Sequence, residues 1–154
     1  RPDGGRLNIL SPEAPPVTDM EKEILDPDDL APARGFNHGI RVSGGDLLFL
    51  AGQDAADETE TIVAPDDLVA QFDQVLSNLQ SVVREAGGTM DDVVKLNVFV
   101  ADRDEYLDLL DPLGEVFADY FEVYPTMALF EVSGFFKEDA LIELEGMAVV
   151  DGEN

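Results

Sequence analysis

Two carboxylates near the end of the chain are the residues best suited to catalysis. Glu143 and Glu145 lie two positions apart in a predicted strand, so both side chains project from one face. A carboxylate in half-apolar surroundings tends to have a raised pKa and can act as a general base toward water. The alternative for Glu143 is a structural pairing with Lys95 or a backbone amide. For Glu145 we favour structural pairing.

A second group of polar residues surrounds the single histidine of the chain. Asn37 and Arg41 flank His38 and could form the polar rim of a cleft, but one histidine is not a metal site, which needs several convergent ligands. We favour a hydrogen-bonded loop residue over a catalytic or ligand contact. Arg34 and Arg41 are scarce cations in an acidic chain. Either could hold an anion, although surface ion pairing is the favoured interpretation.

Gly52 and Gln53 end a predicted strand near a cleft. The glycine permits close approach of the backbone, and Gln53 offers an amide to a ligand. The Asp-rich stretch 54–60 lacks the spacing of a calcium loop, so we interpret it as a solvated acidic loop rather than a cation site. The absence of cysteine excludes disulfides, a thiol nucleophile and a thiolate metal site. We predict neither a metal nor a cofactor.

Hydrophobic spacing predicts the elements that must position these residues. Strands are expected at 39–42, 47–51, 93–100, 127–132 and 141–150. Helices are expected at 66–86 and 103–120, with Pro112 kinking or interrupting the second. The Gly44-Gly45 turn between the first two strands predicts a hairpin. The apolar stripe of the strand at 93–100 is expected to include Val94, Leu96 and Val98.

The order of these elements predicts an α+β fold, a single mixed β-sheet with two helices on one face. The second face is expected to mix apolar and charged side chains. They are Phe99, Met127, Leu129, Met147, Lys95, Glu131, Glu143 and Glu145. An apolar area of this size is not expected to remain exposed to solvent, so we expect an oligomer that covers it. Residues 1–34 hold most of the prolines and no sustained pattern, which predicts an extended or flexible segment before a domain at 35–151.

Charge restricts the possible partners. The chain has 34 Asp and Glu against 9 Lys and Arg, a net charge of −25 over 154 residues, yet 45% of it is hydrophobic. This composition indicates a folded domain with an acidic coat, and it favours a salt-adapted cytosol, in a halophile, over an anion-repelling functional role. No basic stripe is present, which disfavours nucleic acids and anionic membranes. The apolar runs are too short to span a membrane and no signal peptide is visible, so we expect a soluble cytoplasmic protein.

Four stretches, in order and spacing, resemble the RidA/YjgF family of reactive-intermediate deaminases, also described as L-PSP-like endoribonucleases. The stretches are Gly35-Phe36-Asn37-His38-Gly39, then 46–53, 71–87 and 124–148. The resemblance covers about 36–150. It implies a chorismate-mutase-like fold and a homotrimer, in which three sheets form a closed barrel with the helices outside and a cleft at each subunit interface.

The chain departs from the family pattern at two positions of that cleft. In active members, an Arg on the penultimate strand binds the substrate carboxylate, and a Glu on the final strand positions the water that hydrolyses a 2-imino acid to a 2-keto acid and ammonia. Glu143 matches this Glu. Met127 occupies the Arg position and Phe36 that of a Tyr, so the chain resembles the Arg-lacking branches of the family. An arginine placed at position 127 would be expected to face Glu143 across the cleft.

We predict one catalytic residue, Glu143, and a set of candidate ligand-binding residues. The set is Met127, Phe36, His38, Gln53 and Glu145. Met127 and Phe36 are expected as pocket wall, with plain core packing as the alternative. We predict a trimer that hydrolyses an imine or enamine with altered specificity, because the carboxylate-binding Arg is missing. The alternative is a non-enzymatic small-ligand-binding or chaperone-like trimer. Ribonuclease activity is disfavoured by the negative charge.

Overall fold

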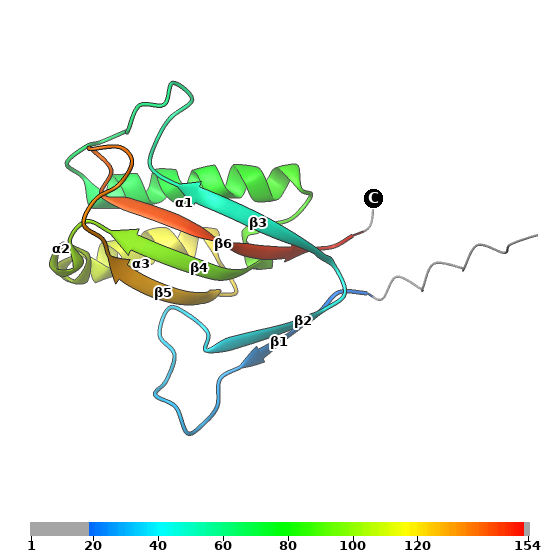
Figure 1. The fold of residues 1–154 in the computed structure, drawn as a ribbon. Coiled ribbons are helices and arrows are strands. Elements are labelled where there is room, and N and C mark those ends of the chain that lie inside the picture. The colour runs from blue at the N-terminus through cyan, green and yellow to red at the C-terminus, as the bar shows by residue number, and fades with distance from the viewer. Residues whose placement is uncertain (1–18, 153–154) are drawn as a thin grey trace, which may run out of the picture.

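The computed structural model describes residues 19–152, which form a four-stranded sheet, a two-stranded ribbon and helices on one sheet face (Figure 1). The strands are β1 (Glu21–Leu25), β2 (Gly39–Ser43), β3 (Asp46–Gln53), β4 (Val93–Val100), β5 (Thr126–Glu131) and β6 (Ile142–Val150). The helices are α1 (Leu68–Glu85), the short 3-10 turn η1 (Met90–Asp92), α2 (Arg103–Asp108) and α3 (Leu110–Tyr120). The predicted α+β class with a mixed sheet is confirmed.

The four-stranded sheet has the order β3-β6-β4-β5. Strands β4 and β5 run parallel, whereas β6 is antiparallel to both β3 and β4. One face of the sheet packs against α1 and α3 and forms the core, where Leu96, Val98 and Leu144 are fully buried beneath Phe72 and Leu79 of α1. The opposite face has no helix on it (Figure 1).

Helix α1 owes its position to its apolar stripe and its ends to local capping. Asp67 caps the first turn by accepting a hydrogen bond from the Ala70 N–H at 3.0 Å. At the other end Gly87, with φ of 83°, allows a Schellman motif. In it, the Gly87 N–H donates to the Arg84 carbonyl and the Gly88 N–H to the Val83 carbonyl.

The predicted interruption of the second helix is confirmed, and it lies at Leu109 rather than at the proline. Pro112 sits in the first turn of α3, where a missing N–H costs little. In a continuous helix Pro112 would have left the Asp108 carbonyl without its partner, and its ring would have collided with that carbonyl. The chain therefore ends α2 at Asp108 and starts α3 two residues later.

The predicted hairpin between β2 and β3 is wrong. Gly44 and Gly45 do reverse the chain, with φ of 72° and 75°, but the strands then diverge (Figure 1). Strand β3 pairs with β6, and β2 pairs with β1. Strand β1 lies inside the segment expected to be extended or flexible. Lys22 fixes it to η1, donating from Nζ to the Asp91 carbonyl at 2.7 Å and to Asp92 Oδ1 at 2.9 Å. Residues 1–18 of that segment lie outside the described residues.

The two sides of β5 are the reverse of those predicted. The parallel register pairs Leu96 with Met127 and Val98 with Leu129, so Met127 and Leu129 project toward the helices. Ala128 and Phe130 take the open face instead. Because side chains alternate along a strand, an error of one residue exchanges every inward position with an outward one.

A β-bulge at the start of β4 corrects a second expectation. Val93 pairs with Ala148 and Lys95 with Met147, so β4 carries one residue more than β6 between these pairs. Val93 is therefore buried in the core, whereas Val94, which was expected there, is only half-buried. The bulge brings the Lys95 carbonyl over Gly146, where a Cβ atom would collide with it.

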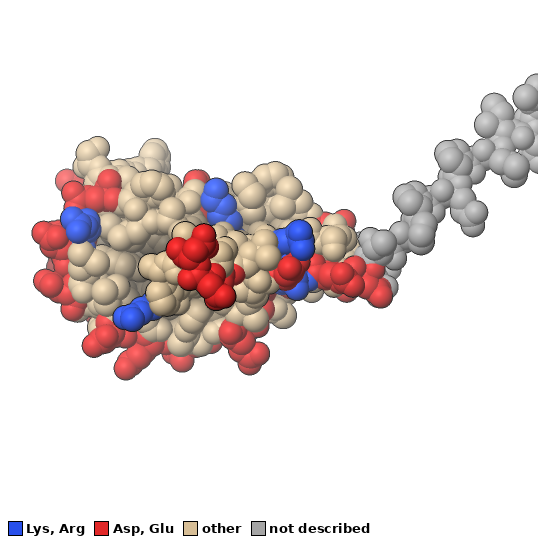
Figure 2. Space-filling model, turned by 90° about the horizontal axis from the view of Figure 1, so that it is seen from below, with Lys and Arg blue, Asp and Glu red and all other residues tan. Residues whose placement is uncertain are grey.

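Acidic side chains outnumber basic ones on the face of the molecule drawn in Figure 2. In Figure 2, Asp and Glu line much of the outline of the face shown, whereas Lys and Arg occur singly. Within residues 19–152, ion pairs join Lys22 to Asp92, Arg41 to Glu23 and Lys137 to Asp54. In the same part of the chain, no helix has the length and apolar character needed to cross a bilayer.

Candidate functional site

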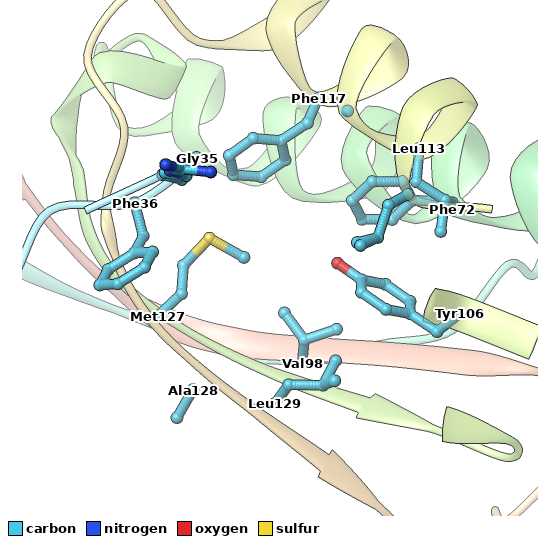
Figure 3. A pocket seen from close by; sticks show the side chains of 13 residues that line it. Gly35, Phe36, Phe72, Val98, Tyr106, Leu113, Phe117, Met127, Ala128 and Leu129 are labelled. Atoms are coloured by element: carbon cyan, nitrogen blue, oxygen red, sulfur yellow. The ribbon is translucent and has the colours of Figure 1, made fainter. Parts of the chain in front are cut away.

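A cavity of about 390 Å³ opens between the edge strand β5 and helices α2 and α3 (Figure 3). Its walls come from four parts of the chain and are almost entirely carbon. They are formed by Arg34, Gly35 and Phe36 before β2, Phe72 of α1, Val98, Met127 and Leu129 of the sheet, and Tyr106, Leu113 and Phe117 of α2 and α3. Among residues 19–152, no Asp or Glu lines this cavity, and Arg34 is the one charged residue that does.

Phe36 and Met127 both contribute to the wall of this cavity, side by side in Figure 3. Met127 reaches it because β5 turns this side chain toward the helices. The structure thus brings together the two positions at which the family resemblance places ligand contacts. Their binding of a ligand stays a prediction.

The loop carrying Phe36 is fastened to the start of β5 by Asn37. The Asn37 N–H donates to the Pro125 carbonyl at 3.0 Å, and its side-chain Nδ2 donates to the Tyr124 carbonyl at 2.6 Å. Because Pro125 and Tyr124 directly precede β5, these two bonds fix the distance between the loop and Met127. The rim of the cavity is therefore held in place before any ligand arrives.

His38 is a loop residue and does not line the cavity. Its Nε2 donates to the Ala31 carbonyl at 2.7 Å, and its N–H donates to Asp26 Oδ1 at the same distance. The ring also meets Phe36 edge-on, with centroids 5.2 Å apart. These contacts support the favoured interpretation of His38 as a hydrogen-bonded loop residue that positions Phe36.

Tyr106 supplies a hydroxyl that the sequence analysis did not assign to the site. The side chain enters from α2, opposite Phe36, and the hydroxyl points into the cavity toward Met127 (Figure 3). Burial alone raises the pKa of Tyr106, and no hydrogen bond or charge of a described residue contributes to that shift. Because the spacing of Tyr106 in the helix expected at 103–120 is the same as that of a core tyrosine, no signal in the sequence separates a core position from a cavity position.

The two candidate anion-binding arginines differ in their surroundings. Arg41 forms a surface ion pair with Glu23, as expected. Arg34 takes part in none of the ion pairs formed within residues 19–152, and it contributes to the cavity wall. Arg34 is thus a cation whose charge no described carboxylate neutralises by direct contact.

Glu143 lies on the open face of the sheet, beside Phe99 in the register of β4 and β6. Its carboxyl has a pKa raised above the ordinary value, first by burial and then by the negative charges of Asp54 and Glu145. Gly52 makes room for it, since a Cβ atom there would lie 2.9 Å from Glu143 Oε1. The surroundings match those expected of a general base.

Glu143 and Met127 do not face each other within one chain. The register places Met127 beside Leu96 on the helix face and Glu143 beside Phe99 on the open face. The expectation that position 127 faces Glu143 across a cleft between subunits concerns two chains and stays a prediction.

Glu145 also lies on the open face, apart from the cavity. Its Oε1 accepts a long hydrogen bond of 3.4 Å from Asn97 Nδ2, and with Lys95 and Phe49 it borders a shallow hollow. This surrounding is consistent with the structural pairing that we favoured for Glu145.

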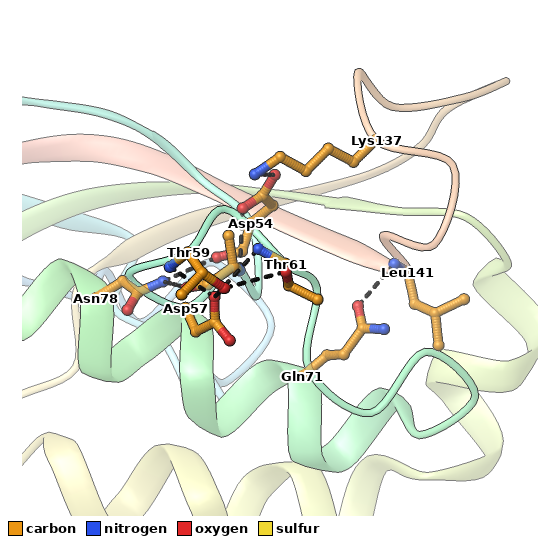
Figure 4. Close-up of polar contacts among 9 residues, drawn as sticks. Asp54, Asp57, Thr59, Thr61, Gln71, Asn78, Lys137 and Leu141 are labelled. Atoms are coloured by element: carbon orange, nitrogen blue, oxygen red, sulfur yellow. Dashed lines mark hydrogen bonds and ion pairs between the residues drawn. The ribbon is translucent and has the colours of Figure 1, made fainter.

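Gln53 lies at a third place, beside the acidic loop that follows β3. There Asn78 Nδ2 donates to the Asp54 and Ala56 carbonyls at 3.1 and 2.9 Å (Figure 4). Gln53 shares a shallow depression with Asp54 and Asn78, remote from Met127 in the fold.

Asp57 holds that acidic loop together. Its Oδ1 accepts from the Thr59 N–H at 2.8 Å, the Thr59 hydroxyl at 2.7 Å and the Thr61 N–H at 3.1 Å (Figure 4). These bonds, led by the Thr59 hydroxyl, lower the pKa of Asp57. The carboxylate is engaged by its own loop, which agrees with a structural role for the stretch 54–60.

Gln71 is a further residue whose role the sequence analysis missed. It is fully buried in α1 and accepts a hydrogen bond from the Leu141 N–H at 2.8 Å. Its Nε2 donates to the Asp139 and Ala64 carbonyls at 3.0 and 3.1 Å. Gln71 thereby fixes Leu141, the residue before β6, as Figure 4 shows. Glu143 is the second residue of that strand. The signal was a polar residue beside Phe72 in an otherwise apolar helix stripe.

Comparisons with known proteins agree with this fold. A family model described as Endoribonuclease L-PSP matches residues 27–150, a span that begins ahead of the domain start predicted at residue 35. A RutC family protein of Pyrococcus abyssi is 31% identical over 131 residues, covering 84% of this chain and 98% of the relative. Another, from Pyrococcus horikoshii, is 34% identical over 108 residues, covering 70% and 82%.

Solved structures show the same similarity. A protein of unknown function of the conserved Rid family, YyfB from Yersinia pestis, is 31% identical with a TM-score of 0.76, covering 84% of this chain and 98% of that one. The YjgF gene product of E. coli is 29% identical with a TM-score of 0.61, covering 68% and 81%.

Proposed function

The chain belongs to the endoribonuclease L-PSP family, with RutC and Rid proteins among its relatives, and from that premise we propose that it binds a small metabolite between subunits and hydrolyses an imine or enamine there. The observation that carries the proposal is the carbon-lined cavity beside Phe36 and Met127. These are the positions at which the resemblance implies substrate contacts. We assign no RNA-cleaving role, because a net charge of −25 opposes the approach of a polyanion.

The proposed cleft needs two copies of the chain. Glu143 lies on the open face and the cavity on the helix side, so one copy would supply the carboxylate and its neighbour the cavity. The open face also carries large apolar side chains, with Phe49 exposed at 68%, Leu47 at 57% and Phe130 at 48%. Burying them between copies would remove apolar area from water and support the homotrimer that the family resemblance implies.

The proposed reaction is the addition of water to a carbon–nitrogen double bond. Glu143 takes a proton from a water molecule whose oxygen attacks the imine carbon, giving a tetrahedral carbinolamine. The protonated Glu143 returns this proton to the nitrogen, which completes the neutral carbinolamine. The carboxylate then carries the proton of the carbinolamine hydroxyl to the nitrogen, the carbon–nitrogen bond breaks, and a carbonyl compound and ammonia leave. The raised pKa of Glu143 suits both steps, because a carboxyl both accepts and donates a proton more readily when its pKa lies closer to the pH of the reaction.

The catalytic role of Glu143 is tested with imines generated in the cuvette by an amino-acid oxidase, following their decay. Glu143→Gln should lower turnover by about a hundredfold or more, the usual contribution of a general base. Glu145→Gln, which changes the same charge on the same face, should retain most activity. Wild-type rates for Glu143→Gln on every substrate turned over would refute the mechanism.

The placement of the site between copies is tested by complementation. Glu143→Gln removes the base, and Met127→Trp fills the cavity, so each variant alone should be inactive. If a cleft combines two chains, each half of a cleft in a randomly mixed trimer has a one-in-two chance of being intact. About a quarter of the clefts then have both halves intact. A mixture with no activity above the separate variants would show that each site lies within one chain.

A second candidate function is ligand binding without turnover. Met127 carries no charge to anchor a carboxylate and Phe36 carries no hydroxyl, so both specific contacts implied for active family members are absent at these positions. A small molecule retained in a native mass spectrum, together with no hydrolysis of any imine in the assay above, would favour this alternative.

A further inference from the structure

The cavity described above has an apolar interior larger than a two- or three-carbon metabolite requires. Its volume is about 390 Å³. Phe72, Leu113 and Phe117 form its floor and are 5% exposed or less, so the wall that a ligand can reach comes mainly from Phe36, Tyr106, Met127 and Leu129. The rings of Phe72 and Phe117 lie nearly parallel, with centroids 6.0 Å apart. Such walls favour a bulky apolar or aromatic group, because burying it removes apolar area from water.

Only two polar side-chain groups contribute to this interior, and both are donors. The Tyr106 hydroxyl points inward from α2 (Figure 3), and Arg34 lines the cavity from the loop before β2. Neither belongs to an ion pair within residues 19–152. Tyr106 is half-buried whereas Arg34 is exposed, so Tyr106 offers a donor to an acceptor atom inside the cavity and Arg34 offers one to an anionic group at its mouth.

The loop that carries Arg34 is built to hold its position. Two hydrogen bonds from Asn37 attach it to the residues before β5, and the His38 ring bonds back to Ala31 within the same loop. Gly35, with φ of 74°, makes the turn that presents Arg34 and Phe36 to the cavity. The arginine therefore lies on a braced segment and not on a free surface loop, which lowers the entropic cost of binding an anion.

Resting on the proposed function, we propose that the cavity selects aromatic 2-oxo and 2-imino acids, with Arg34 binding the carboxylate in place of the missing strand arginine. The adjacent oxo or imino atom accepts a hydrogen bond from Tyr106, and the ring packs against Phe36, Met127 and Leu129. Arg34 and Tyr106 are the specificity-determining contacts, and they lie on elements other than the strand that carries Met127. The chain thus replaces two lost polar contacts by two others on different walls of the same cavity.

The test measures binding of three stable probes by calorimetry, in concentrated salt that screens the acidic coat. Phenylpyruvate has the ring, the oxo group and the carboxylate. Pyruvate lacks the ring, and phenylacetone lacks the carboxylate. The wild type should bind phenylpyruvate about tenfold or more tightly than either, since a charge-assisted bond or a buried ring each contributes at least that factor.

Variants assign the contacts. Arg34→Gln should remove the preference for phenylpyruvate over phenylacetone, whereas Arg84→Gln, the same charge change in α1, should leave it intact. Tyr106→Phe should weaken both ligands about fivefold while keeping their ratio. Thermal melts establish that each variant is folded. A wild type that prefers pyruvate, or an Arg34→Gln variant that keeps the preference, would overturn the inference.

These outcomes are separate from those of the hydrolase test, because the probes are not turned over. Selective binding of phenylpyruvate without imine hydrolysis would support this specificity and refute the enzymatic reaction. Hydrolysis of small imines without binding of phenylpyruvate would support the enzymatic reaction and refute this specificity.

Discussion

Replacing Gln71 by methionine should destabilise the protein by about 3 kcal/mol, although the two side chains have similar length and volume. Gln71 is the only polar or charged residue that is fully buried among residues 19–152. It makes three hydrogen bonds to backbone groups, to the Ala64 and Asp139 carbonyls and from the Leu141 N–H. Methionine can make none of them.

The magnitude follows from the surroundings of the three backbone groups. Ala64 and Asp139 are exposed residues, so water can replace Gln71 as the hydrogen-bond donor to their carbonyls. Each lost bond then lowers the stability by about 1 kcal/mol, the net value of one hydrogen bond. The Leu141 N–H precedes the buried Ile142, and leaving it without a partner costs about 1–3 kcal/mol. Burial of the more apolar methionine side chain offsets part of this loss, so the free energy of unfolding falls by about 3 kcal/mol in total.

Urea unfolding at fixed salt and protein concentration is the suitable assay. Urea is uncharged, so it does not screen the acidic coat as guanidinium would, and a fixed concentration removes the effect of subunit association. Gln80→Met is the matched control, because Gln80 lies in the same helix but is partly exposed. Its unfolding midpoint should stay close to that of the wild type.

An equal midpoint for Gln71→Met and Gln80→Met, with the same m-value, would refute the reasoning. It would mean that water or a shifted loop replaces all three bonds at no cost. The polar residue in the core would then have no part in fixing the start of β6.

Two further predictions concern the strand that carries Glu143. Gly146→Ala should destabilise by more than about 3 kcal/mol in thermal or urea unfolding, because the new Cβ collides with the Lys95 carbonyl, whereas Gly134→Ala, with open space around it, should behave as wild type. Glu143→Gln should raise the melting temperature at neutral pH. The folded state raises this carboxyl pKa above 4.5, so it binds the proton more tightly than the unfolded chain and stability falls as pH rises through that window. The gain should vanish below the ordinary carboxyl range, and a variant less stable than wild type at neutral pH would contradict the assignment.

Elements set by local spacing could be predicted from the sequence. The strand at 93–100 and the helix ending before Gly87 appear where the apolar periods place them, because burial of one face and a glycine cap are local requirements. The helix break near Pro112 has the same origin. The family resemblance then placed Phe36 and Met127 on one site, and both line the same cavity.

Features set by distant partners could not be predicted in this way. The pattern of β5 is apolar on both sides, so only its parallel register with β4 decides that Met127 points toward the helices. Strand β2 finds its partner in β1, whose short, charged sequence gives a weak strand signal. The spacing of Tyr106 is the same whether its hydroxyl faces solvent, core or cavity, and its role depends on the loop at Arg34.

The bulge at Val94 links two positions that are far apart in the chain. The additional residue pushes the Lys95 carbonyl across β6, and only a residue without a side chain can lie beneath it, which is Gly146. Deleting Val94 would remove the bulge and with it the requirement for glycine. A larger residue at position 146 would be tolerated only in a chain that also carries this deletion. The dependence therefore runs one way. A lineage that keeps the bulge must keep Gly146, whereas a lineage that has lost the bulge is free to change this residue, so the length change has to precede the substitution.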